Sequence, residues 1–521
     1  MSNLRWLDLA IVALYMAALS CTGLLFSRRQ TSTETYFVAR RSVPSWAMGL
    51  SLLATLISSV TFVAYPGSAY DKDWSLLVPG LMVLLVLALA GWVIIPFYRE
   101  AVGMSAYEYF GRRFGKPARV YSSLAYTLAH FSKMGFVVYL LGLTIHSMTD
   151  FPIDYVIGVV SAVTIFYTVM GGLEAVIWTD VIQGMVIWVG ALVSLAYLLF
   201  LPQGGPAAVV RFAVEHHRFS FGNPTFDLTR PTIPVLMFYG FFYYLQRYVA
   251  DQTLVQRYLV AKSDRDALRG VSLGSLLCVP VWLLFMLIGT CTWSFYKLTG
   301  EKLPAYIGKA DQVFPYFLAT HLPAGVAGLF MASLTGAAMS LLASDLNCLA
   351  VVGVEDFYRL RRPHATESQR LRLAKVIVTV FGVLAAGTAI LLAHSKGNAL
   401  STWFSVSAIV SGGLVGLFLL AFLSKRANRK GAWTGIIACW SFTAWATLTL
   451  GDKRLVDLGR FNFPWHDYMI GAIGHLILLV VGYSASLFFS QDADDDVASH
   501  ATFWEWLRYR RPRAVAATTR G

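Results

Sequence analysis

The sequence has few charged residues and few cysteines for a chain of 521 residues. Only 14% of the residues are Asp, Glu, Lys or Arg, against about a quarter in a soluble globular domain, while 57% are apolar. This composition excludes a disordered chain and argues against a soluble enzyme. The five cysteines stand singly inside apolar stretches, without the paired spacings of a zinc site or a disulfide framework.

The sequence also lacks the residue patterns of several classes of membrane protein. It has no repeated pore-loop filter or lining ring of charges, as a channel would have. It has no clustered metal ligands and no nucleophile with a spaced base, so neither an enzyme nor a cofactor is expected. After the last apolar run, residues 491–521 hold only an acidic and a basic patch, too short for a signalling module. A channel and a transporter-fold membrane sensor are therefore the disfavoured alternatives.

Long apolar runs dominate what the sequence does contain. A helix needs about 20 apolar residues to cross a bilayer, and thirteen stretches qualify. The first is longer than the roughly 7–15 apolar residues of a cleavable signal peptide. The sequence thus predicts an all-α, multi-pass protein of the cell membrane, with spans at 6–27, 45–70, 74–98, 120–147, 153–170, 175–200, 233–256, 271–295, 323–352, 374–394, 401–423, 431–450 and 467–490.

The basic residues indicate the orientation of these spans. Of the 42 Lys and Arg residues, 28 fall on one side of the predicted spans and 12 on the other. The positive-inside rule assigns the richer side to the cytoplasm, which predicts an N-terminus outside and a C-terminus inside. The net charge of +13 is explained in this way, and no nucleic-acid partner is expected.

Two basic residues remain, and both fall near the middle of apolar spans. They are Lys133 and Arg247, and we expect them to be the only cations deep within the membrane. A cation at the bilayer centre costs roughly 2.5–3.5 kcal/mol on insertion scales, so it needs a partner. An anionic ligand would supply that partner only when bound, whereas Asp180, Asp345 or Asp251 would supply it permanently.

A motif spans the junction between two predicted helices. In YTVMGGLEAVIWTDVIQ (167–183), Gly171 and Gly172 allow a tight cytoplasmic reversal, after which Asp180 enters the membrane. This stretch resembles the signature of the sodium/solute symporter family. The similarity covers about residues 35–440 and continues in order through SAYEYFGRRFG (105–115), DQTLVQRYLVAKS (251–263), ADQVFPYFLATHLPAGVAGLFMASL (310–334) and the GxxxG-containing run at 412–435.

The resemblance implies a LeuT-like fold with two inverted repeats of five helices. The first helix of each repeat is expected to be interrupted at mid-membrane, where free carbonyls bind ions. In the first repeat a polar Ser58-Ser59-x-Thr61 stretch stands at that place. The implied divisions are an extra N-terminal helix at 1–35, repeats at 45–200 and 233–423, two further helices at 431–490, and a cytoplasmic tail at 491–521.

The resemblance also implies sodium positions. One sodium would bind the carbonyls of Ala54, Ile57 and Ala337 and the hydroxyl of Ser340. The family's usual next hydroxyl is Leu341 here, which removes one ligand from a hard cation that wants several oxygens. A second ion position would use Asp180 with Ser340 and Ser344, although Ala343 is apolar. Asp345 adds a carboxylate that is either a charge or proton relay or an internal partner for a buried cation, and proton coupling stays open.

The substrate positions that the resemblance implies favour an acid over a sugar. Lys133 matches the basic residue that meets the carboxylate in sialic acid transporters, and Arg247 falls at a gating position. Cys278 and Leu56 replace the sugar-binding lysine and asparagine. His130, one turn from Lys133, is interpreted as a satisfied core histidine. The expected substrate-binding residues are Lys133, Arg247, Gln246, Ser58, Thr61 and Tyr243.

The sequence therefore predicts a secondary active transporter that imports a small organic solute, carrying a carboxylate, together with sodium. Inward movement of one cation down 100 mV supplies about 2.3 kcal/mol for such work. The alternatives of the same fold are a proton-coupled symporter and a sodium/sugar symporter. The partners expected are the solute and the lipid bilayer, and the oligomeric state is left open.

Overall fold

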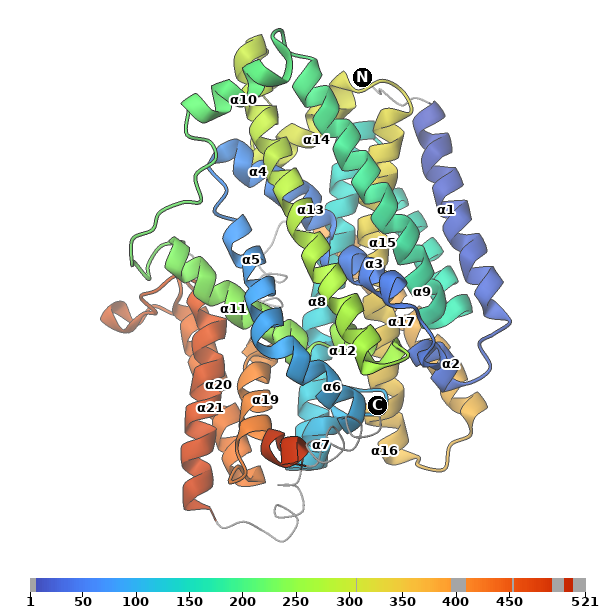
Figure 1. Cartoon of the computed structure of the whole chain (residues 1–521), viewed down its shortest axis with the longest axis vertical. Coiled ribbons are helices and arrows are strands. Elements are labelled where there is room, and N and C mark those ends of the chain that lie inside the picture. Colours follow the sequence, from blue (N-terminus) through green and yellow to red (C-terminus); the bar gives the residue numbers. More distant parts are fainter. Residues whose placement is uncertain (1–5, 306, 395–408, 452–453, 490–500, 509–521) are drawn as a thin grey trace, which may run out of the picture.

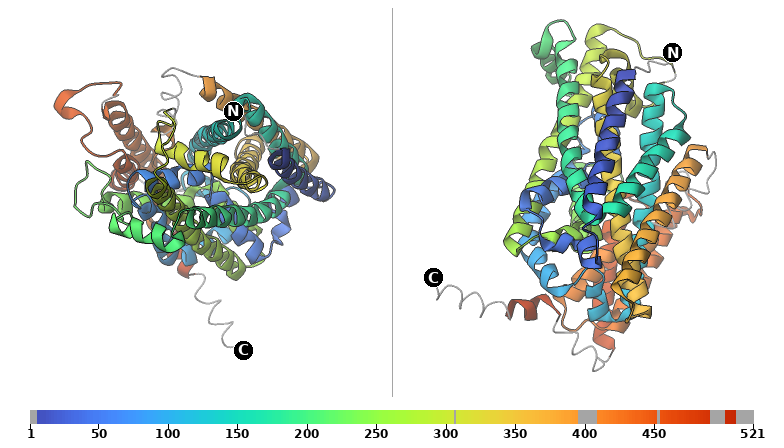
Figure 2. Two further views of the ribbon diagram at one scale, coloured as in Figure 1. Left: turned by 90° about the horizontal axis from the view of Figure 1, so that it is seen from above. Right: turned by 90° about the vertical axis from the view of Figure 1, so that its right-hand side faces the viewer.

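The computed structural model describes residues 6–305, 307–394, 409–451, 454–489 and 501–508. Within these residues the chain is all-α, and its one β-bridge joins Val43 to Ala261. The helices pack side by side as a bundle, with α1 (Trp6–Ser27) at one edge and α20 (Arg429–Thr449) with α21 (Tyr468–Phe488) at the other (Figures 1 and 2). The predicted all-α class is confirmed.

Eight helical segments of the described residues are long and apolar enough to cross a membrane. A ninth is the bent pair α3 (Ser45–Leu56) and α4 (Ser59–Asp71). The predicted span 401–423 lies partly outside the described residues; its described part is 409–423, which includes α19 (Leu414–Leu423), so the count of thirteen stays a prediction. The eight are Trp6–Ser27, Leu77–Ala101, Lys116–Thr149, Ile153–Phe200, Asp264–Thr299, Val326–Arg361, Glu367–His394 and Tyr468–Phe488.

Helix α9 (Ile153–Phe200) contains the reversal that the two glycines predicted. Gly172 has φ 57° and ψ −156°, a conformation that L side chains rarely adopt. Before it, the Tyr167 hydroxyl donates to the carbonyl of Met339. After it, Asp180 contacts Ser340, and the carbonyl of Val186 accepts from Ser333. From Asp180 to Val186 the residue numbers rise, whereas those of their partners on α15 (Val326–Val352) fall from 340 to 333. The segment of α9 after Gly172 therefore runs antiparallel to α15.

Two helices are interrupted, as the resemblance implied. Between α3 and α4, Ile57 and Ser58 have extended backbone, and the two halves are bent by 59°. The Ser58 amide donates to Thr61 Oγ1 instead of to a carbonyl of α3. Between α11 (Ile233–Ala250) and α12 (Gln252–Val260), Asp251 is extended and its side chain caps α12 at Thr253 N, 2.8 Å away.

Helix α15 forms the centre of the protein. It packs against α1, α3, α8 (Lys116–Thr149), α9 and α17 (Glu367–His394), and most of its length is buried. The Asp8 carboxylate of α1 accepts from the amides of Gly325 and Gly328 at the start of α15, 2.7 Å each. An acid at a helix N-terminus stabilises both partners, which fixes the extra helix against the core.

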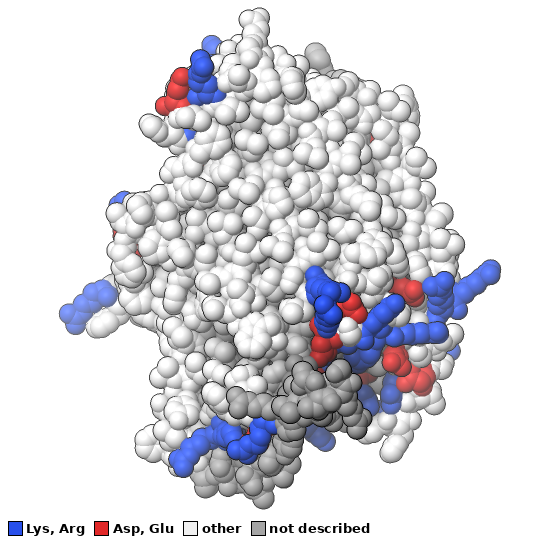
Figure 3. Space-filling model, viewed as in Figure 1, with Lys and Arg blue, Asp and Glu red and all other residues white. Residues whose placement is uncertain are grey.

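The remaining helices surround this centre, and the charged residues lie at its ends. In the view of Figure 3, Lys, Arg, Asp and Glu gather towards the lower right, with smaller groups at the upper left, the left edge and the lower left, and the broad central face is uncharged. An uncharged belt is the surface that a hydrocarbon layer requires. The other helices are α2 (Thr33–Val38), α5 (Leu77–Val86), α6 (Trp92–Ala101), α7 (Glu108–Phe114), α10 (Gly205–Glu215), α13 (Asp264–Thr299), α14 (Val313–His321) and α16 (Arg359–Arg361).

Candidate functional site

Asp180 lies at a meeting point of four helices. Its carboxylate accepts from Ser51 of α3 at 2.6 Å and from Ser340 of α15 at 2.5 Å. The guanidinium of Arg257, on α12, lies 3.1 Å away. All four residues are fully buried. The structure thus brings the predicted residues Asp180 and Ser340 together and adds an arginine to them.

Arg257 also holds the other polar groups of this cluster. It donates to Ser344 at 2.8 Å, to the Thr253 carbonyl at 2.8 Å, and to Thr55 of α3. The site predicted for a second cation beside Asp180 and Ser344 is therefore lined by a cation of the protein itself. Because an arginine keeps its charge even when buried, Asp180 is neutralised in this conformation.

Arg257 corrects one expectation from the sequence. Lys133 and Arg247 are not the only cations enclosed by the helices, because Arg257 lies beside Asp180 and Arg113 is also buried. Both were assigned to cytoplasmic loops. The break at Asp251 turns α12 into the protein, and Arg113 donates to the carbonyls of Ala421 and Ser424 at the end of α19. The sequence indicated the position of Arg257 only by placing it in the same motif as Asp251, DQTLVQRYLVAKS (251–263).

The predicted ligands of the first sodium lie on α3 and α15, which pack together. Ala54 and Ile57 are at the end of α3, where the last carbonyls of a helix have no intrahelical partner. The Thr55 and Ser344 hydroxyls, 3.4 Å apart, show how closely the two helices approach. Ala337 and Ser340 are fully buried on α15, and Leu341 is buried beside them. Ligation by these atoms stays a prediction.

Lys133 pairs with Asp345 inside the protein. The Lys133 ammonium on α8 lies 2.9 Å from Asp345 Oδ2 on α15. The Lys133 side chain is 28% exposed, whereas the Asp345 side chain is fully buried. The structure thus contains the internal carboxylate partner that the sequence left open. The Lys133 side chain nevertheless stays partly exposed.

Arg247 pairs with Asp251, one turn further along the same chain segment. The contact joins the last turn of α11 to the break before α12. Arg247 is 11% exposed at its side chain, and its guanidinium lies 5.8 Å from the centre of the Tyr243 ring. Both predicted substrate-binding cations therefore have a carboxylate partner in this conformation.

His130 connects these two ion pairs. Its Nδ1 lies 2.8 Å from Asp345 Oδ1, and its Nε2 lies 3.5 Å from Asp251 Oδ2. The Lys133 ammonium is 3.1 Å from the same Nδ1. The sequence interpretation of a satisfied buried histidine agrees with these contacts. What the sequence did not indicate is that it joins two carboxylates.

The other predicted substrate-binding residues lie at the break between α3 and α4 and on α11. Ser59, the first residue of α4, donates to the Val137 carbonyl at 3.3 Å, one helical turn from Lys133. Thr61 is buried near this break, while Ser58 is half-buried. On α11, Tyr243 is 41% exposed and Gln246 is half-buried. A binding role for these four stays a prediction.

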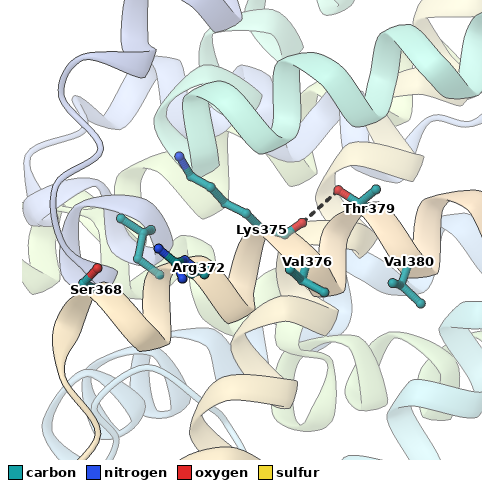
Figure 4. A pocket seen from close by; sticks show the side chains of 7 residues that line it. Ser368, Arg372, Lys375, Val376, Thr379 and Val380 are labelled. Carbon is teal, nitrogen blue, oxygen red and sulfur yellow. Dashed lines mark hydrogen bonds between the residues drawn. The ribbon is translucent and has the colours of Figure 1, made fainter.

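Two surface hollows lie away from the charged group, by which we mean Lys133, His130, Arg247, Asp251 and Asp345. One, of about 470 Å³, follows a single face of α17, where Arg372 and Lys375 precede Val376 and Val380 (Figure 4). The other, of about 170 Å³, is lined mainly by α1, α9 and α15 side chains, including Val160 and Met331. Neither hollow is lined by a predicted site residue.

Comparison with known proteins decides the family. Residues 36–439 match the sodium:solute symporter family. The chain belongs to this family. It is 31% identical to the sodium/sialic acid symporter of Aliivibrio fischeri, over 92% of this chain and 93% of that protein. It is also 31% identical to the sodium/sialic acid symporter of Proteus mirabilis, over 92% and 94% respectively.

Solved structures agree with the fold of this symporter family member. A sodium-coupled sialic acid symporter, in a substrate-bound outward-open state, superposes with a TM-score of 0.85 at 30% identity, covering 94% of this chain and 99% of that one. A nucleobase-cation-symport-1 family transporter matches at 0.55 and 14% identity, covering 89% and 97%, which shows the fold alone. The LeuT-like fold is confirmed, and the chain is a membrane transporter.

Proposed function

We propose that this symporter imports a small organic anion, bound through its carboxylate, together with sodium. The observation that carries the proposal is the position of Lys133. It lies one helical turn from Val137, where α8 contacts the start of α4, and its side chain is 28% exposed. The side chains of Arg247 and Arg257 are 11% and 0% exposed. Of these three cations, Lys133 has the most exposed side chain.

Lys133 suits a carboxylate that must be bound and released. A lysine ammonium is a compact charge on a flexible stem, so it can turn from one oxygen to another. Two unit charges 4 Å apart attract by about 4 kcal/mol at the effective dielectric constant of a protein site. A solute carboxylate would replace Asp345 as the partner at comparable energy, so binding is reversible. The relatives named for sialic acid, which is a carboxylic acid, support this class of solute.

Arg247 has a second role in this proposal. Its guanidinium holds Asp251 at the break between α11 and α12. Tyr243 covers the arginine from the exposed side. We therefore assign Arg247 to the shape of the site, through Asp251, and not to direct contact with the solute. We expect substitution of Lys133 to affect the affinity for an acid more than substitution of Arg247.

We place the coupling sodium between α3 and α15. Its ligands would be the carbonyls of Ala54, Ile57 and Ala337 and the hydroxyl of Ser340, because the break frees the carbonyls at the end of α3. We assign Asp180 no direct contact with this sodium, because Arg257 pairs with its carboxylate at 3.1 Å. Leu341 offers no oxygen at the usual next position, so we expect weak sodium affinity.

A screen of purified protein tests the solute class and the coupling ion together. Thermal shifts would be recorded with sialic acid, lactate, gluconate, glutamate, galactose and mannitol, in sodium or in potassium chloride. We expect a carboxylate to raise the melting temperature in sodium and not in potassium. A neutral sugar as the strongest stabiliser, unaffected by Lys133→Gln, would contradict the proposal.

A further inference from the structure

His130 is a buried titratable group that the proposed function does not use. It lies on α8, is 8% exposed, and stacks on Tyr126 with ring centres 3.9 Å apart. Stacking fixes the plane of the imidazole ring. The ring is therefore held so that one nitrogen faces Asp345 of α15 and the other faces Asp251 at the α11–α12 break.

The contacts of the ring differ between its two protonation states. A neutral imidazole has one N–H and one acceptor nitrogen, whereas the protonated ring has two N–H groups. In the neutral ring, Nδ1 accepts from the Lys133 ammonium at 3.1 Å while Nε2 donates towards Asp251, and the 2.8 Å contact between Nδ1 and Asp345 Oδ1 then contains no proton. In the protonated ring, Nδ1 donates to Asp345 at 2.8 Å instead. Lys133 opposes this second proton while its ammonium stays beside Nδ1.

The charges that face the ring come from three segments. Lys133 and the Tyr126 hydroxyl belong to α8, Asp345 to α15, and Asp251, with its partner Arg247, to the α11–α12 break. With the ring neutral, Lys133 and Arg247 balance the two carboxylates. With the ring protonated there are three cations and two carboxylates, so one more anion is needed for neutrality.

We propose that His130 is a proton-binding site: it becomes protonated and pairs with Asp345 when Lys133 turns from Asp345 to the carboxylate of a solute. Three ion pairs then form: Lys133 with the solute, protonated His130 with Asp345, and Arg247 with Asp251. The proton comes from solvent and travels with the anion. The transport of this proton rests on the proposed function, whereas the link between His130 and Asp345 does not.

The proton changes the driving force of transport. One sodium and one monovalent anion carry no net charge, so the membrane potential does not act on that pair. A proton added to them makes the complex a net cation. A potential of 100 mV then contributes about 50-fold to accumulation of the anion.

The first test needs no solute. Melting of Lys133→Gln would be measured between pH 6 and pH 8.5, beside the double variant His130→Gln/Lys133→Gln. In the single variant only protonated His130 pairs with buried Asp345, so stability is present at low pH and lost as pH rises. We expect its melting temperature to fall by about 3–5 °C over this range beyond any change in wild type. The double variant stays low throughout.

A matched control separates His130 from any other buried histidine. His475 on α21 is 4% exposed and lies outside the charged group. The variant Lys133→Gln/His475→Gln should therefore follow the pH dependence of Lys133→Gln. A pH-independent melting temperature for Lys133→Gln, whether high or low, would overturn the link between His130 and Asp345.

The second test measures the proton directly and does not require Lys133→Gln to fold. Lactate or sialic acid, whichever gives the larger thermal shift, would be added to wild type in weakly buffered sodium chloride at pH 7.5. We expect uptake of close to one proton per bound anion, none in His130→Gln, and wild-type uptake in His475→Gln. Binding without proton uptake in wild type would overturn the proposal. If neither acid binds, the proposed function fails for these solutes, and the melting test still decides the His130–Asp345 link.

Discussion

The Arg257–Asp180 pair gives the sharpest prediction about stability. Replacing Arg257 with Gln leaves the Asp180 carboxylate fully buried, with the Ser51 and Ser340 hydroxyls but no cation. Breaking one partner of a buried ion pair typically costs about 3–5 kcal/mol. For a chain of 521 residues the entropy of unfolding is about 1.1 kcal/mol per degree. The melting temperature should therefore fall by about 3–5 °C.

The rescue of this variant distinguishes charge from packing. Adding Asp180→Asn to Arg257→Gln removes the stranded charge, so we expect most of the lost stability to return. Sodium should also stabilise Arg257→Gln more than wild type, because a small cation can take the place of the guanidinium beside Asp180. Both effects would be measured by thermal melting of detergent-solubilised protein in sodium and in potassium. No destabilisation in Arg257→Gln, or no recovery in the double variant, would refute the assignment of this pair.

Three further predictions concern the ion site, the reversal and the orientation. Leu341→Ser supplies the missing hydroxyl and should lower the sodium concentration for half-maximal uptake by about 3–10-fold, about 0.7–1.4 kcal/mol; an unchanged value would move the sodium elsewhere. Gly172→Ala should destabilise the protein by about 1–2 kcal/mol, since φ is 57° and an added Cβ would lie 2.9 Å from the Tyr36 carbonyl. A neutral result in melting experiments would show that the turn relaxes. In intact cells an impermeant thiol reagent should label Glu301→Cys and not Ser368→Cys in a Cys21→Ser background, and the opposite pattern would reverse the predicted orientation.

Much of the fold was predictable from the sequence because membranes constrain it strongly. Apolar runs give the helices, since every backbone polar group in lipid must be satisfied within its own segment. Gly172 and the serines at 58–59 gave the reversal and the first break, because their conformational and hydrogen-bonding properties are local. The family followed from the motif that contains Asp180. Local signals of this kind need no knowledge of tertiary contacts.

The pairing of the buried charges was not predictable in the same way. Asp345 on α15 is more than 200 residues from Lys133 and His130 on α8, and only packing decides which carboxylate meets which cation. Arg257 was misplaced because counting loop charges assumes that an apolar run continues straight to the cytoplasm. The break at Asp251 invalidates that assumption. Charge counting therefore fails where a helix is interrupted, which in this fold is at the proposed binding site.

The most direct test of the proposed mechanism is uptake of an acid into proteoliposomes driven by a sodium gradient. Wild type and Lys133→Gln would be compared with the carboxylate that best stabilises the protein, with Lys375→Gln on the outer face of α17 as the matched control. The account predicts sodium-dependent uptake by wild type and Lys375→Gln, and a KM at least about tenfold higher in Lys133→Gln, which corresponds to about 1.4 kcal/mol. Equal KM values in all three proteins, or uptake that does not depend on sodium, would contradict it.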